Sequence, residues 1–170
     1  PSISNEQQGE LGDCYFISTL GSIANSNPTA IQNMFVNNGD GTYTVRFYYG
    51  ATADYVTVDS KLPTQSGMLV YSDYGDSYSS TSNVLWIALA EKAYAEWNQT
   101  GKEGRDGKNA FASIEGGWMA TVDAQILGHN ASDYSMTAGA KQYAVNALTA
   151  HYAVNIGTAK AIEGLVASHA

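Results

Sequence analysis

The stretch QGELGDCY, residues 8–15, places the only cysteine of the protein at the start of an amphipathic segment. Apolar residues after Cys14 recur at steps of three and four as far as Ala24, which predicts a helix that begins at the cysteine and ends before Pro28. Unsatisfied N–H groups and the positive end of a helix dipole favour the thiolate form of a cysteine in that position. Cys14 is therefore a candidate nucleophile, although a lone cysteine in an arbitrary sequence is more often a small buried apolar residue.

Gln8 is the second candidate residue in this stretch. It lies six positions before Cys14, across a turn that contains Gly9 and Gly12. Such a turn would allow its side-chain amide to lie beside the backbone N–H of Cys14. Two N–H donors at that point would form an oxyanion hole, which stabilises the negative charge that develops when a thiolate attacks a carbonyl group.

A cysteine nucleophile that works near neutral pH needs a histidine as its base, and the sequence contains three. His129 lies in a turn rich in glycine and asparagine, and His151 is expected at the start of a strand, so solvent-exposed roles are the default for both. His169 lies in an otherwise apolar segment, 155 residues after Cys14. That separation is close to the roughly 130 to 150 residues found in papain-like enzymes, which favours His169 as the base.

Composition excludes several classes of partner. The 170 residues are 44% hydrophobic, and 8 basic residues stand against 16 acidic ones, for a formal net charge of -8. Nucleic acids and anionic membranes are therefore poor partners, and no segment approaches the roughly 20 apolar residues that span a bilayer. The single cysteine forms no internal disulfide, and no Cys/His cluster has the spacing of a zinc site. The cellular compartment stays open.

Local patterns elsewhere in the chain predict an α+β protein. Residues 61–82 indicate a loop-rich surface segment, and Gly128 a hinge. The other expected elements are strands over 43–49 and 55–59, helices over 29–36, 83–97, 120–127 and 138–150, and strands over 152–156 and up to residue 169.

The QGELGDCY stretch and the apolar helix after it resemble the active-site signature of the calpain family of papain-like cysteine proteases. Further blocks follow in the order of the family, at residues 58–64, 85–95, 114–117 and 164–170, so the resemblance spans nearly the whole chain. It implies a papain-like fold of two lobes with a substrate cleft between them. Residues 1–127 would form the helical lobe with the cysteine, and residues 128–170 the start of an incomplete antiparallel-sheet lobe with the histidine.

The resemblance also implies roles for individual residues. Cys14 would be the nucleophile, Gln8 the oxyanion-hole side chain and His169 the base. Gly116 and Gly117 match the glycine pair whose backbone holds an extended polypeptide substrate. Glycine suits that task because its backbone can approach another main chain closely and pair with it as in a sheet.

Three positions depart from the family pattern. Tyr15 replaces the usual tryptophan after the cysteine, which keeps a large aromatic ring. We expect no cofactor: the resemblance makes calcium possible, but Asn5 stands where an acidic residue of a calcium-gated core would be expected, and the sequence does not support calcium dependence. The catalytic asparagine of the family follows the histidine, whereas Asn155 precedes it and is expected on the exposed face of a strand. We therefore expect that asparagine beyond residue 170, and the 170-residue chain alone to be nearly inactive.

The leading functional hypothesis is a calpain-type cysteine endopeptidase that forms a thioester acyl-enzyme. Within this hypothesis, cleavage of its own larger parent protein is as plausible as general proteolysis. The alternative is a catalytically dead calpain-like module that binds extended peptides. Transglutaminase-type acyl transfer, which also uses cysteine and histidine, rests on fold-level analogy alone.

Overall fold

Helix α1, Cys14–Ser26, begins at the cysteine, as predicted. The computed structural model describes residues 1–2, 8–72, 85–135 and 137–157. The α1 face that carries Phe16, Leu20 and Ile23 is buried, because these residues recur on one side of the helix and pack into the core. After α1, the side chain of Asn27 accepts a hydrogen bond from the N–H of Ala30 (3.2 Å) and caps a short helix α2, Pro28–Gln32.

An antiparallel sheet of three strands follows, in the order β1, β2, β3. Strand β2, Thr42–Tyr49, pairs with β3, Thr52–Asp59, and the two confirm the strands predicted over 43–49 and 55–59. The helix predicted over residues 29–36 is wrong in its second half, where residues 35–37 form strand β1, Phe35–Asn37. The reason is a long-range one: Phe35 pairs with Val45 at the open edge of β2, a contact that helical periodicity does not reveal.

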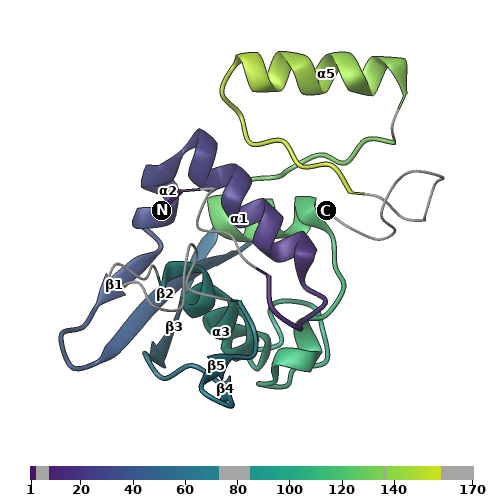
Figure 1. Ribbon diagram of the computed structural model, residues 1–170. Coiled ribbons are helices and arrows are strands. Elements are labelled where there is room, and N and C mark those ends of the chain that lie inside the picture. Colours follow the sequence, from purple (N-terminus) through teal and green to yellow (C-terminus); the bar gives the residue numbers. More distant parts are fainter. Residues whose placement is uncertain (3–7, 73–84, 136, 158–170) are drawn as a thin grey trace.

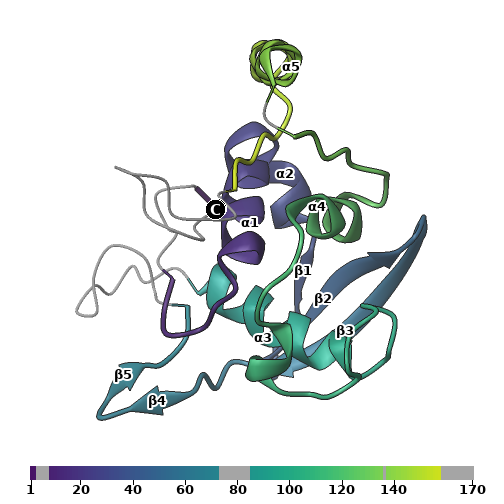
Figure 2. The ribbon, with the colours of Figure 1, turned by 90° about the vertical axis from the view of Figure 1, so that its right-hand side faces the viewer.

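Helix α3, Trp86–Asn98, lies between α1 and the sheet (Figures 1 and 2). Its apolar residues are buried, and its aromatic rings stack on both neighbours. Tyr94 stacks on Phe16 of α1 with ring centroids 4.3 Å apart, and Trp97 stacks on Phe47 of β2 at 5.0 Å. Such pairs add directional packing to the burial of their large apolar areas. The core therefore joins α1, α3 and the sheet.

The remaining elements are short or lie at the surface. A small hairpin of β4, Thr64–Gln65, and β5, Met68–Leu69, lies in the predicted loop-rich segment. A 3-10 helix η2, Phe111–Ile114, precedes helix α4, Met119–Leu127, which ends at Gly128 and packs on α1 and β2. Helix α5, Ala138–Thr149, has no buried residue and stands apart from the other helices (Figure 1). Among the described residues, no helix is long and apolar enough to cross a membrane.

The predicted strand over residues 152–156 is wrong, because this segment has no regular structure. Instead, the hydroxyl of Ser22 on α1 donates to the carbonyl of Val154 (3.1 Å) and accepts from its N–H (3.0 Å). A side chain thus takes the place of a neighbouring strand for this residue. The predicted final strand, with His169, lies outside the described residues. The division into lobes at residue 128 stays a prediction.

Candidate active site

Residues 8–14 are here called the Cys14 turn. They contain Gln8 and Cys14, two of the residues that the sequence predicts to act together. Cys14 is the first residue of α1 and is half-buried, so the first turn of the helix directs its N–H groups toward the cysteine end. The side-chain Nε2 of Gln8 donates to the carbonyl of Leu11 (2.7 Å), so Gln8 folds back over the turn. A primary amide has two N–H donors, and the second one can serve another acceptor.

The Cys14 turn is held in place from its start. The N–H of Glu10 donates to the carbonyl of Val70 (3.0 Å). A Cβ atom at Gly9 would lie 2.1 Å from the carbonyl oxygen of Tyr71, so only glycine allows the two backbones to approach this closely. The turn is therefore docked on the segment that follows β5.

Residues 113–117, here called the glycine segment, hold the other end of the turn. The N–H of Gly116 donates to the carbonyl of Gly12 (2.9 Å), which ties the segment to the residues just before Cys14. A Cβ atom at Gly117 would lie 2.4 Å from the ring of Tyr15, so no larger residue fits there. The structure thus brings Gln8, Cys14 and the two predicted substrate-binding glycines into one region.

Two of the three histidines and Asn155 lie in the described part of the chain. His129 and His151 are both exposed, as expected from their surroundings in the sequence. His169 lies outside the described residues, so its role as base stays a prediction. Asn155 is half-buried in an irregular segment, which corrects the expectation that it lies on the exposed face of a strand.

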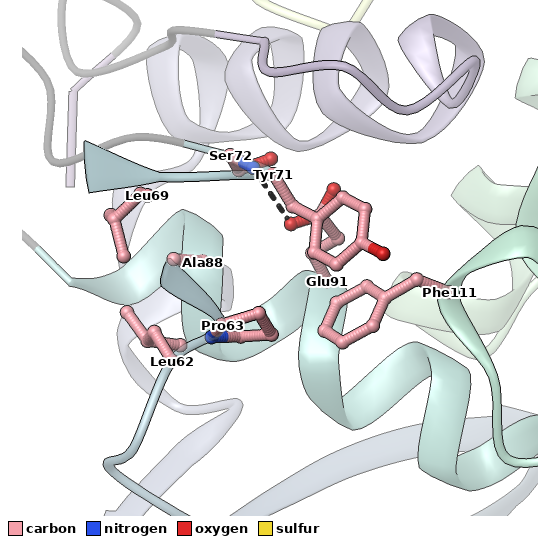
Figure 3. Close-up of a pocket in the computed structure, with 8 residues that line it drawn as sticks. All are labelled: Leu62, Pro63, Leu69, Tyr71, Ser72, Ala88, Glu91 and Phe111. Atoms are coloured by element: carbon pink, nitrogen blue, oxygen red, sulfur yellow. Dashed lines mark hydrogen bonds between the residues drawn. The ribbon is translucent and has the colours of Figure 1, made fainter. Parts of the chain in front are cut away.

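Two buried acids behind Cys14 were not found from the sequence. Asp13 is 0% exposed and Glu91 on α3 is 1% exposed, and the side chain of each shifts the pKa of the other. The Oε2 atom of Glu91 accepts the N–H of Ser72 (2.9 Å) in the interior (Figure 3). The two residues are far apart in the sequence, and no local pattern connects them.

This acid pair holds a proton. Burial, together with the neighbouring charge of Asp13, raises the pKa of Glu91 to about 8. Burial also raises the pKa of Asp13, to about 6, although the neighbouring side chain of Glu91 acts in the opposite direction. Two carboxylates in contact cannot both ionise easily, so one proton is shared between them near neutral pH.

The pair makes the stability of the protein pH-dependent. An unfolded glutamic acid loses its proton near pH 4.5, whereas folded Glu91 keeps it to about pH 8. The free energy of unfolding should therefore fall as pH rises between these values, by up to about 1.4 kcal/mol per pH unit. In Glu91→Gln, the amide can accept from Ser72 and donate to Asp13, so this part of the slope should disappear.

Urea unfolding at pH 5, 6, 7 and 8, followed by tryptophan fluorescence, checks this prediction. The exposed Glu10, substituted as Glu10→Gln, is the control and should keep the slope of the parent protein. Equal slopes for Glu91→Gln and the parent would contradict the shared proton.

Figure 3 shows a small pocket beside Glu91. Apart from Glu91 and Ser72 its lining is apolar and aromatic, with the rings of Tyr71 and Phe111 stacked at 4.0 Å. None of the site residues predicted from the sequence lines it. The pocket borders the acid pair and is separate from the glycine segment.

A bound metal ion requires several ligating side chains in one place. Within residues 1–2, 8–72, 85–135 and 137–157, no three side chains of His, Cys, Asp or Glu form a group that could hold a metal ion. Asn5 lies outside the described residues.

The chain is similar to known proteins over most of its length. Calpain clp-1 of Caenorhabditis elegans is 28% identical over 171 residues, which cover 96% of this chain and 21% of the relative. Calpain clp-4 of the same organism is 30% identical over 173 residues, covering 96% and 23%. The calpain-type cysteine protease DEK1 of Zea mays is 30% identical over 139 residues, covering 79% and 6%. The chain thus spans less than a quarter of the length of each of these relatives. Because the family described as calpain family cysteine protease matches residues 2–170, this chain belongs to the calpain family of cysteine proteases.

Proposed function

We propose that the protein is a cysteine endopeptidase whose active site is built on the Cys14 turn and the glycine segment. The observation that carries this proposal is the hydrogen bond between the N–H of Gly116 and the carbonyl of Gly12, which places a backbone suited to an extended substrate next to the cysteine. Membership of the calpain family supports the same chemistry.

In the proposed reaction, His169 takes the proton from the Sγ of Cys14, and the thiolate adds to the carbonyl carbon of a peptide bond. The negative oxygen is held by the N–H of Cys14 and the side-chain amide of Gln8. The C–N bond then breaks, and the imidazolium gives its proton to the leaving amine. Water adds to the thioester, the carboxylic acid leaves, and the thiol is restored.

Gly117 is the proposed main-chain contact for the substrate. Both polar backbone groups of Gly116 are used inside the protein, its N–H by Gly12 and its carbonyl by Arg105. Within the described residues, neither backbone group of Gly117 forms a hydrogen bond, so both can pair with an extended polypeptide. Trp118 comes next and is 74% exposed, which offers an apolar surface to substrate side chains. The proposed substrates are therefore unfolded or extended segments of polypeptide, including segments of the parent protein itself.

Gln8→Ala tests the oxyanion hole. The donor acts on charge that develops in the transition state, so its removal should lower kcat by about 10² to 10³ and change KM little. The measurement is hydrolysis of casein, an unfolded polypeptide, by the full-length protein. Alkylation of Cys14 by iodoacetamide should proceed as in the parent, because the nucleophile is still present.

Gln7→Ala is the matched control, since it removes the same kind of side chain from the preceding position. An unchanged kcat in Gln8→Ala would remove Gln8 from the site, and an equal loss in Gln7→Ala would show that the assignment is one residue out. A full-length protein that is alkylated at Cys14 but releases no peptide from casein would favour the peptide-binding module over the protease.

A further inference from the structure

Arg105 lies in the loop after α3 and contacts both the glycine segment and the residue that follows Cys14. Its guanidinium donates to the carbonyls of Gly116 (2.5 Å), Glu115 (3.1 Å) and Ser113 (3.4 Å), all in the glycine segment. It also donates to the hydroxyl of Tyr15 (2.5 Å) and lies over the Tyr15 ring, 5.2 Å from its centroid. One side chain thus joins the glycine segment to the residue after Cys14.

The guanidinium is itself held in place. Its Nε pairs with the carboxylate of Glu103 at 2.5 Å, and the side chains of Arg105 and Glu103 are 20% and 0% exposed. A planar guanidinium with five N–H donors can hold several acceptors at once in a fixed geometry. The buried carboxylate of Glu103 therefore holds the guanidinium close to the glycine segment.

Tyr15 completes the arrangement through its hydroxyl. That hydroxyl accepts from Arg105 and donates to the carbonyl of Ile114 (2.8 Å). The tryptophan that is usual at this position in the family has an indole N–H, which donates but cannot accept from a guanidinium. The tyrosine is thus suited to a partner arginine in a way that tryptophan is not.

We propose that Arg105 is a positioning residue of the active site, a clamp that holds the glycine segment against Tyr15 and so fixes Gly117 where the substrate backbone must pair. This inference rests on the proposed function, because it assumes that Gly117 receives the substrate. Arg105 is not proposed to touch the reacting atoms. Loss of the clamp should weaken substrate binding and leave the reactivity of Cys14 intact.

The main test measures binding without cleavage. The affinity of fluorescein-labelled casein for the full-length protein is determined by fluorescence anisotropy in a Cys14→Ala background. Adding Arg105→Ala should raise Kd by about tenfold, since a displaced backbone loses its pairing with the substrate. Arg105→Lys keeps the charge but lacks the planar donor set, so it should recover only a small part of the affinity.

Kinetics on the protein with Cys14 intact supply the second readout. Arg105→Ala should raise KM by about tenfold, with a change in kcat below about threefold, and the rate of alkylation by iodoacetamide should stay within about twofold. Tyr15→Phe is a milder variant, which should also raise KM. Combined with Arg105→Ala it should add little, because both changes break the same contact.

Arg46→Ala is the matched control, because Arg46 also lies over a tyrosine ring, that of Tyr48, at 5.0 Å, but on β2. It should leave Kd and KM unchanged, and thermal unfolding followed by circular dichroism checks that each variant is folded. An unchanged Kd in folded Arg105→Ala, full recovery by Arg105→Lys, or a parallel loss of iodoacetamide reactivity would each overturn the clamp alone. If the Cys14→Ala protein binds no casein, the clamp and the proposed function both fail.

Discussion

Replacement of Cys14 by alanine is expected to abolish peptide hydrolysis, with a loss in kcat of about 10⁶, the scale seen when a covalent nucleophile is removed from a protease. The reason is that no other group in the site can form the acyl-enzyme. The measurement is hydrolysis of casein by the full-length protein. The enzyme concentration is calculated from the mass of protein in the assay.

Ser18→Ala is a suitable control for Cys14→Ala, because Ser18 lies on the next turn of α1 and also carries a small polar side chain. Its turnover should stay within a few fold of the parent. Undiminished hydrolysis by Cys14→Ala would end the assignment of a cysteine protease mechanism, whatever the family of the chain.

His169→Ala should produce the second largest loss, of about 10⁴ or more in kcat/KM, because the thiol of Cys14 would have no base and the leaving amine no acid. His129→Ala and His151→Ala are matched controls, since both histidines are exposed, and each should stay within a few fold of the parent. The measurement is kcat/KM for casein between pH 5 and 9.

The three histidine variants also test the order of the second lobe. If His151→Ala is the inactive variant and His169→Ala is not, the assignment of residues 164–170 to the family's histidine block is wrong. If all three retain activity, a different group must deprotonate Cys14.

Much of the fold follows from patterns within single segments. Helices α1, α3, α4 and α5 and strands β2 and β3 lie where their apolar periodicity predicts them. The two errors have a common cause. Residues 35–37 form a strand because β2 offers an edge, and residues 152–156 do not form one because Ser22 takes the hydrogen bonds of Val154. In both cases the decision is made by a partner distant in sequence, which a local pattern cannot contain.

Three features can be predicted from the amino-acid sequence: Cys14 begins a helix, Gln8 can return to it across a short turn, and the sequence blocks resemble one family. These features depend on residues only a few positions apart, where chain geometry leaves few alternatives. Two other features depend on the folded chain: Asp13 lies near Glu91 in the interior, and Arg105 reaches Tyr15, 90 residues away. Such contacts arise when α1, α3 and the glycine segment pack around one core, because burial forces polar groups to find partners wherever the fold brings them together.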